Sequence, residues 1–227
     1  MLVAHRLFPT PIEVTAEIWR LAAAGHLIGD MARTLARAGA GFLIAMVLGT
    51  AIGIGLGRVG WADRLFSAWL TVGLNLPAIV VAIVLYIWLG LTELALVTAV
   101  VINKLPLVVA MIREGVRSFL PEYEELGRAL RWPLMRRLRL VFLPQLMPFV
   151  LAAARTGLSL IWKIVLVFEV LGSDGGVGYR VSVMFQFFDM PGILAYTTAF
   201  ILVVLAFDAA VMRPIENEVL KWRQPRD

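Results

Sequence analysis

The chain has 227 residues, of which 60% are hydrophobic and 16% are charged, whereas a soluble domain carries about a quarter charged residues. Long apolar runs separate the charged segments, so the composition excludes a soluble protein and leaves no polar stretch long enough for a separate soluble domain. The chain lacks cysteine, and neither His5 nor His26 has a metal-ligand neighbour at helical spacing, so no metal site is predicted. Its net charge of +5 fits the positive-inside rule rather than a nucleic-acid partner.

Residues 1–34 are predicted to form an N-terminal segment on the periplasmic side or at the membrane interface. Pro11 opens a pattern that predicts a helix over residues 12–24. Three charged side chains make this helix too polar to cross a bilayer, so we expect it to lie along the membrane surface.

Residues 35–227 are predicted to form the transmembrane domain, whose first span covers residues 35–57. This span carries small residues at every fourth position, which favours close packing against another helix. These residues are Gly41, Ala45, Gly49, Gly53 and Gly57.

The second span is predicted over residues 65–89, with a kink or break near Asn75 because Pro77 removes a backbone hydrogen bond. The third span, residues 94–112, is interrupted by polar residues and a proline. These are Asn103, Lys104 and Pro106.

A basic segment with seven arginines follows over residues 113–139. The fourth span is predicted over residues 146–170, a glycine-rich loop over residues 172–178, and the fifth span over residues 192–212. The sequence thus predicts an all-α integral membrane protein with about five transmembrane helices.

Lysine and arginine counts set the orientation of the chain. If the loop at 113–139 is cytoplasmic, that side carries 13 of them and the opposite side carries 5. The positive-inside rule therefore places this loop in the cytoplasm and the N-terminus outside. A missing first span would explain an N-terminus on the outer side.

The cytoplasmic loop, residues 113–144, has a helical pattern of its own. Pro121 is followed by Glu122, Glu124 and Glu125, and acidic residues in a first turn complement the helix dipole. A short helix that projects from a membrane protein can dock into a partner's groove. The alternative is a helix that rests on lipid headgroups, which anionic lipid would oppose.

The same loop resembles the coupling loop of binding-protein-dependent ATP-binding cassette (ABC) importer permeases. Their pattern is E-A-A, three residues, G, nine residues, then I-x-L-P, and the spacing is kept here. The matching positions are Glu125, Leu126, Gly127, Arg131, Val141, Leu143 and Pro144. Arg131 takes the place of the glycine, so we expect the loop to depart from the family's tight turn there, because glycine readily reaches positive φ and arginine does not.

Other segments resemble the nitrate/sulfonate/taurine-type permeases of that family. They are Phe8-Pro-Thr-Pro11, Glu169-Val-Leu-Gly172 leading into Gly175-Gly-Val-Gly-Tyr179, and Phe207-Asp208 with Arg213-Pro-Ile-Glu216 and Trp222-Arg223. Members of that group carry one more span at the N-terminus, which we expect this chain to lack. The resemblance covers nearly the whole chain and implies a type I ABC importer permease (MetI-like) core.

The resemblance also implies a function and partners. The chain would be a permease subunit of the bacterial inner membrane, itself no enzyme, that forms the path for a small, anionic solute of the nitrate, sulfonate or taurine kind. It would work with a second permease subunit as a homodimer, with cytoplasmic ATPase subunits that bind ATP and Mg²⁺, and with a periplasmic binding protein. This chain would hold no cofactor of its own. The alternative is a secondary transporter or channel that works without ATP, which inverted repeats would favour.

Ionisable residues inside a span are costly and face protein or water. Candidates for the translocation path are therefore Lys104, Arg155, Lys163 and Glu169, together with the polar Asn103 beside Lys104. The cations suit an anionic solute, and the alternative is structural pairing, for instance of Lys104 with Glu169. The glycine loop does not fit a phosphate-binding fingerprint, so we expect a periplasmic turn against which the binding protein sits. Its glycines are Gly172, Gly175, Gly176 and Gly178.

Overall fold

The computed structural model describes residues 9–220, and the parts of the predicted domains at residues 1–8 and 221–227, with Trp222 and Arg223, lie outside them. The described part is helical from end to end, without a strand. Its elements are α2 (Pro11–Ala23), α3 (His26–Arg58), α4 (Gly60–Asn75), α5 (Ala78–Leu89), α6 (Glu93–Arg117), α7 (Pro121–Ala129), α8 (Leu134–Arg137), η1 (Leu138–Phe142), α9 (Leu143–Gly172), α10 (Val177–Gln186), α11 (Met190–Phe207), η2 (Asp208–Met212) and α12 (Arg213–Leu220).

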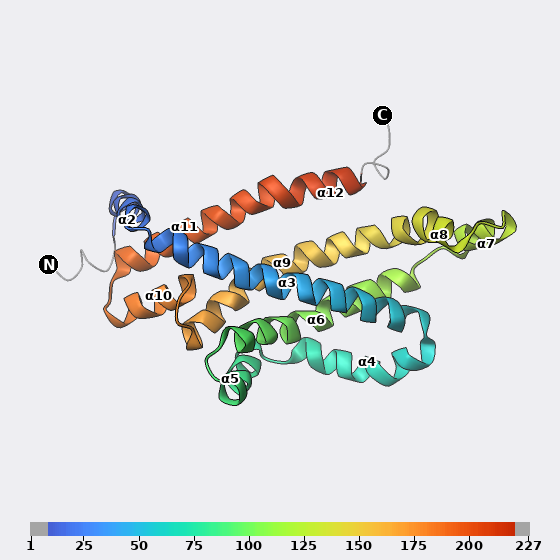
Figure 1. Cartoon of the computed structure of the whole chain (residues 1–227), viewed down its shortest axis with the longest axis horizontal. Helices are drawn as coiled ribbons and strands as arrows, with labels where there is room; N and C mark the ends of the chain where they lie inside the picture. The colour runs from blue at the N-terminus through green and yellow to red at the C-terminus, as the bar shows by residue number, and fades with distance from the viewer. Residues whose placement is uncertain (1–8, 221–227) are drawn as a thin grey trace.

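Four of these helical stretches are long and apolar enough to cross a membrane, and the bent pair α4–α5 adds a fifth if it counts as one span. Helices α3, α6, α9 and α11 run along the long axis of the molecule (Figure 1). Helix α2 lies across one end of this bundle, and α7 and α8 project from the other. The all-α membrane fold with about five spans is therefore confirmed.

The first and third spans differ from their predicted bounds. The first begins nine residues earlier, because α3 starts at His26 and runs without a break to Arg58. Pro106 was expected to interrupt the third span, but α6 continues through it from Glu93 to Arg117. A predicted kink near Asn75 is present and is sharp, since α4 and α5 meet at 93°.

The closest helix pair, α3 and α6, depends on the predicted stripe of small residues. A Cβ at Gly49 would lie 2.7 Å from the Cβ of Val108, and one at Gly53 would lie 2.7 Å from the Cβ of Ile112. Ala45, on the same face, is 1% exposed. The absence of side chains on α3 thus lets α6 lie against its backbone, as the four-residue spacing predicts.

The core has two parts along the long axis. One hydrophobic cluster, toward α2 and α10, includes Val100 and Leu158, and the other, toward α7, includes Val108 and Ala153. Lys104 lies between Val100 and Val108 on the same face of α6. A charged residue thus marks the point in the sequence of α6 at which one cluster gives way to the other.

Candidate functional site

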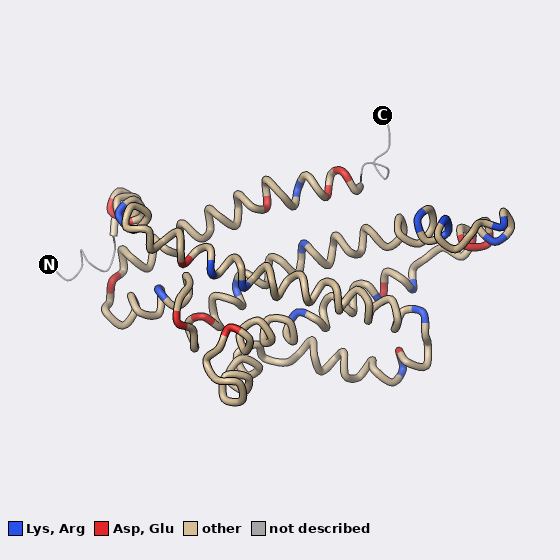
Figure 2. The backbone as a smooth tube through the Cα atoms, viewed as in Figure 1, with Lys and Arg blue, Asp and Glu red and all other residues tan. Residues whose placement is uncertain are grey.

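Helix α7, which holds the acidic end of the predicted coupling loop, projects beyond the bundle. Several of the Lys and Arg positions, blue in Figure 2, lie along the chain at this end, as the positive-inside rule requires of a cytoplasmic face. Pro121 occupies the first turn, and Glu122 and Glu124 lie at the positive end of the helix dipole. The local sequence thus accounts for this short helix.

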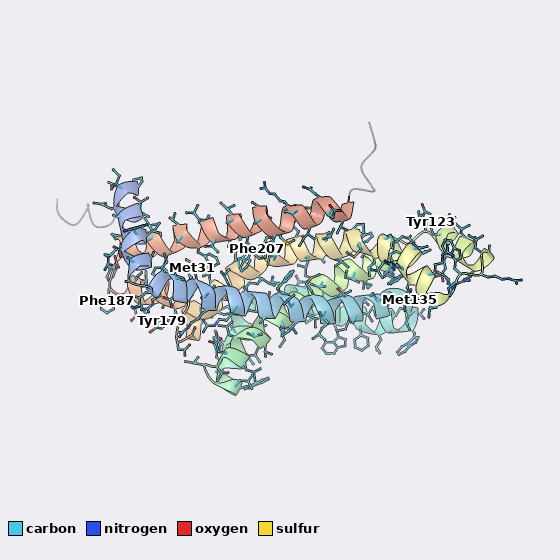
Figure 3. The ribbon with its side chains drawn as sticks, turned by 45° about the horizontal axis from the view of Figure 1, so that its top comes forward. Met31, Tyr123, Met135, Tyr179, Phe187 and Phe207 are labelled. Atoms are coloured by element: carbon cyan, nitrogen blue, oxygen red, sulfur yellow. The ribbon has the colours of Figure 1, made fainter. Side chains whose placement is uncertain are left out.

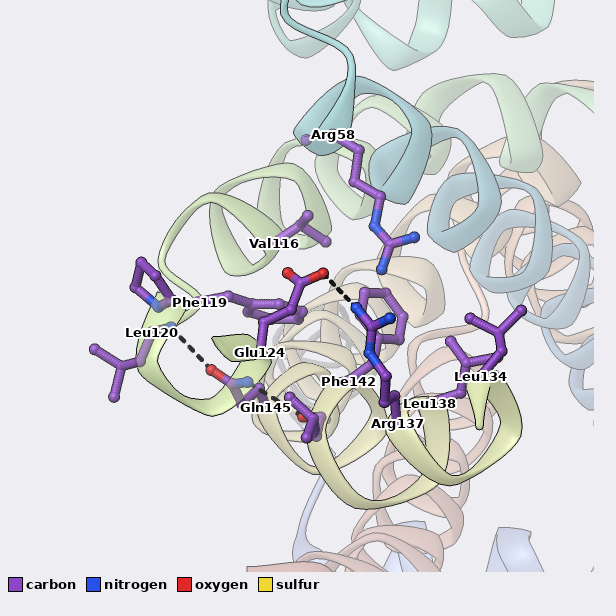
Figure 4. Close-up of a pocket in the computed structure, with 13 residues that line it drawn as sticks. Arg58, Val116, Phe119, Leu120, Glu124, Leu134, Arg137, Leu138, Phe142 and Gln145 are labelled. Atoms are coloured by element: carbon purple, nitrogen blue, oxygen red, sulfur yellow. Dashed lines mark hydrogen bonds and ion pairs between the residues drawn. The ribbon is translucent and has the colours of Figure 1, made fainter. Parts of the chain in front are cut away.

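Two side-chain contacts hold α7 and the residue before it against α8 and the beginning of α9 (Figure 4). The guanidinium of Arg137 donates to the carboxylate of Glu124 at 2.7 Å, and the backbone N–H of Leu120 donates to the side chain of Gln145 at 3.0 Å. Glu124 also accepts from Arg128 at 3.0 Å, and this hydrogen bond lowers the pKa of its carboxyl. The loop is therefore fixed to the span that follows it.

Arg131, expected to disturb the turn, instead takes the conformation that a glycine would supply. Its φ is 50°, in the left-handed region. The backbone N–H of Arg131 donates to Arg128 at 2.9 Å, and that of Trp132 donates to Gly127 at 3.0 Å, which closes the turn at the C-terminus of α7. The expectation was wrong, because these two hydrogen bonds hold a backbone conformation that arginine adopts at a cost of about 1–2 kcal/mol.

A pocket of about 500 Å³ lies between α7, η1 and the ends of α3 and α6. Arg58 stacks on the ring of Phe142 with its guanidinium carbon 4.3 Å from the ring centroid, as Figure 4 shows. This contact joins the cytoplasmic end of α3 to η1. Beside the pocket, Leu126 and Leu134 are at least half exposed, and Tyr123 and Met135 project outward in Figure 3.

The structure separates the predicted coupling residues into two sets. Glu122, Glu125, Leu126 and Leu143 are exposed, while Gly127 is buried against Arg137 and Trp132. Val141 and Pro144 are half-buried in η1 and the first turn of α9. The exposed set can meet a partner, and the buried set shapes the loop.

Glu169 lies at the opposite end of the bundle inside an ion-pair cluster around Arg37. Arg37, on α3, is 5% exposed and donates to the carboxylate of Glu169 at 2.8 Å and to that of Glu93 at 2.7 Å. Thr34 donates to Glu169 at 2.9 Å, and Arg37 also reaches the carbonyl oxygen of Gly175. Glu169 therefore faces the interior of the subunit, which favours a structural role over a place on the path.

The glycine loop belongs to this cluster. Asp30 accepts from the backbone N–H of Gly176 at 3.2 Å, and Glu169 accepts from that of Gly178 at 2.9 Å. Gly176 has a φ of 101°, and a Cβ there would meet the Glu169 carboxylate. Gly172 and Gly175 are likewise closed in by side chains of Leu91 and Arg33 respectively. The loop is thus fixed by buried polar contacts, whose long-range partners on α3 carry no local signal in the sequence.

The other predicted path residues do not come together. Arg155 pairs with Glu216 on α12. Lys104 is 5% exposed, and within residues 9–220 no carboxylate pairs with it, so the proposed pair with Glu169 is wrong. Asn103 is half-buried beside it on α6.

Lys163 is exposed at the edge of an apolar pocket of about 370 Å³ between α9, α10 and α11. Most of the lining is aliphatic and aromatic, with Trp162 and Phe200 as its rings. Ser159 and Thr197 supply hydroxyls. Of the predicted cations, Lys163 alone within the described residues combines exposure with a pocket in the span.

Residues 17–213 match the family described as the binding-protein-dependent transport system inner membrane component. The chain is 27% identical over 222 residues to the putative aliphatic sulfonates transport permease protein SsuC of Bacillus subtilis (strain 168), with 98% of this chain and 80% of that protein covered. It is 28% identical to the riboflavin transport system permease protein RibX of Chloroflexus aurantiacus, with 95% and 80% covered. Its fold is similar to a chain of the MetNI methionine ABC transporter in an inward-facing conformation, with a TM-score of 0.73, 18% identity, and 85% of this chain and 95% of that chain covered.

Proposed function

We propose a solute and a working assembly on the premise that the chain belongs to the binding-protein-dependent transport system inner membrane component family. The chain is a multi-pass permease of the inner membrane and a transport subunit of an ABC importer. The proposal is that two copies enclose a path for a small organic anion, a sulfonate above all. Cytoplasmic ATPase subunits would bind ATP and Mg²⁺ and act on α7, and a periplasmic binding protein would deliver the solute at the end that carries α2 and α10.

The single observation that carries the ATP-driven assembly is the position of α7. It stands clear of the bundle at the cytoplasmic end and presents exposed Glu125 and Leu126. Its Glu124 is paired with Arg137 of α8, which leads through η1 into α9. A secondary transporter or channel needs no such projecting helix. A movement of α7 would be transmitted to α9 through the contacts of Glu124 with Arg137 and of Leu120 with Gln145.

The proposal of an anionic solute is supported by the positive charge of Lys163. Lys163 lies in a membrane-embedded pocket without a carboxylate partner in the described part of the chain. An unneutralised cation at that depth is costly and marks a functional position. The relative SsuC is named as an aliphatic sulfonate permease and RibX as a riboflavin permease, so uptake of a sulfonate compared with uptake of riboflavin distinguishes the two solute classes.

The assembly is tested by co-purification in mild detergent of this chain with the cytoplasmic ATPase subunits of the proposed transporter. Glu125→Lys combined with Leu126→Arg should reduce the recovered ATPase at least about tenfold, because both side chains are exposed on α7. Arg64→Glu, a charge reversal at the same face of the membrane but outside the loop, is the matched control and should recover the ATPase in full. Equal recovery in all three proteins contradicts the assembly.

The solute is tested in proteoliposomes that contain the full transporter. ATP-dependent uptake of a labelled short alkanesulfonate should be abolished by Lys163→Met and retained by Lys163→Arg, with the complex assembled in both cases. Uptake of riboflavin in place of the sulfonate, or full sulfonate uptake by Lys163→Met, contradicts the anionic solute and leaves the ABC assembly intact.

A further inference from the structure

Helix α4 has three faces of different chemistry. With about 3.6 residues per turn, Asp63, Leu70 and Gly73 fall on one side. This side packs on α6, since Asp63 pairs with Arg113 at 3.1 Å and a Cβ at Gly73 would lie 2.7 Å from Pro106. The rest of the helix surface is not covered in this way, and most of its residues are exposed.

The uncovered surface is divided into an apolar and a polar face. Trp61, Leu65, Trp69 and Val72 lie together on one flank and are between 52% and 72% exposed. This flank has the composition of a surface that meets lipid tails, with tryptophan near the membrane interface.

The polar face lies on the other flank and carries Ser67, Thr71 and Asn75 at four-residue spacing. Thr71 donates to the carbonyl oxygen of Ser67 at 3.1 Å, and Asn75 donates to that of Thr71 at 2.8 Å. These hydrogen bonds satisfy a hydroxyl and one amide N–H. The Asn75 side-chain oxygen has no donor within residues 9–220, and Asn75 is exposed.

The polar face ends at the break between α4 and α5, which lies deep in the span. Gly73 packs on Pro106, near the middle of α6, so residues 75–77 lie close to the same depth. Asn75, Leu76 and Pro77 are all exposed. Non-helical backbone at membrane depth is tolerated where protein buries it or where it lines water, because lipid cannot satisfy its polar groups.

We propose that the face of α4 that carries Ser67, Thr71 and Asn75, with the break at residues 75–77, lines the water-filled passage of the solute. Lipid is a poor occupant, because an exposed amide and an open break in hydrocarbon leave polar groups unsatisfied. The apolar flank beside it already supplies a lipid-facing surface. The inference rests on the proposed transport function and assigns to the path an uncharged stretch made of hydroxyl and amide groups.

The chain contains no cysteine, so a single introduced cysteine is the only thiol of this chain, and the transporter with the unaltered chain measures any reaction at its partners. Thr71→Cys and Asn75→Cys are compared with Val72→Cys, which lies one residue from Thr71 on the apolar flank and is 52% exposed. The probe is a small, charged, membrane-impermeant methanethiosulfonate applied to the assembled transporter in proteoliposomes. A thiol in water ionises and reacts, whereas a thiol in lipid does not, so the first two should react at least about tenfold faster than the third.

Modification of Thr71→Cys or Asn75→Cys should also abolish ATP-dependent uptake, while Val72→Cys keeps it. Equal reactivity of all three cysteines overturns the inference, and so does fast reaction at positions 71 and 75 that leaves uptake unchanged. Absence of ATP-dependent uptake in the cysteine-free protein would count against the proposed function instead. Because the reaction rates require no substrate, they decide the water-filled face in either case.

Discussion

The contact between α3 and α6 predicts that alanine at two glycines of α3, Gly53 and Gly55, changes the stability of the protein in opposite directions. Gly53 is buried against α6, where a Cβ would lie 2.7 Å from the Cβ of Ile112 and 3.0 Å from the carbonyl oxygen of Val109. Gly55, two residues on, is exposed, and a Cβ there would meet nothing within 4 Å. We expect Gly53→Ala to destabilise the protein and Gly55→Ala to stabilise it.

The magnitude follows from the space at each site. Ordinary contacts begin near 3.4 Å, so α6 has to retreat by roughly 0.5–1 Å to admit a methyl group at Gly53, and overpacking of this kind costs about 1–3 kcal/mol. Both substitutions gain about 1 kcal/mol of helix propensity. The propensity gain cancels in the comparison, so the two variants should differ by about 1–3 kcal/mol in the free energy of unfolding.

The assay is thermal unfolding of the purified chain in mild detergent, followed by circular dichroism, with all variants at one detergent concentration. The ranking expected from lowest to highest midpoint is Gly53→Ala, the unaltered protein, Gly55→Ala. Identical midpoints for the two alanine variants would show that α3 and α6 do not lie in the contact described, and the reasoning from the stripe would fail.

Three further predictions concern the ends of the molecule. Arg131→Gly should stabilise the turn after α7 by up to about 1 kcal/mol, because glycine removes a strain of about 1–2 kcal/mol but loses roughly 0.5–1 kcal/mol more conformational entropy on folding. Reduced proteolysis within the loop measures this gain. Arg37→Met should lower the midpoint of unfolding far more than Arg155→Met, since removal of a buried partner costs about 3–5 kcal/mol whereas Arg155 is half exposed; similar losses would contradict the cluster. The hydrogen bond from Arg128 lowers the pKa of Glu124 from its ordinary value of 4.5, so its stabilising effect is present above pH 4.5 and is lost as the pH falls through the lower folded value. Amide exchange of α7, corrected for intrinsic rates, should therefore rise below pH 4.5, and Glu124→Gln should remove that dependence.

The spans were predicted well from the sequence, because a membrane helix is identified by a continuous run of apolar residues of sufficient length. The stripe from Gly41 to Gly57 is likewise local, and it predicted a close neighbour without saying that α6 was that neighbour. Pro106 was misleading, since α6 absorbs it without a break, whereas Pro77 at the start of α5 marks a true one. The difference is that α4 turns away at Pro77, while α6 remains packed on α3 on both sides of Pro106.

The polar sites were predicted less well, because their partners lie far apart in the sequence. Glu169 was recognised as costly, yet its partner Arg37 precedes it by 132 residues and was counted only as one of the five cations on the outer side of the membrane. Arg131 was judged from its intrinsic preference for negative φ, and two backbone hydrogen bonds outweighed that preference. The face of α4 that carries Thr71 was not predicted, because hydroxyl side chains in a span also bond to their own helix backbone and so carry no sign of a water-filled surface.

The contacts at the two ends of α9 also fix how far a movement can travel. The helix has 30 residues and is therefore about 45 Å long, so a tilt of about 5° about its cytoplasmic end displaces the far end by about 4 Å. That distance exceeds the reach of a hydrogen bond, and Glu169 near the far end is held by Arg37 of α3, which also holds Glu93 of α6. A small rotation imposed at α7 thus has two possible outcomes. Either the outer ends of α3, α6 and α9 move together, or the hydrogen bonds from Arg37 to Glu93 and Glu169 break.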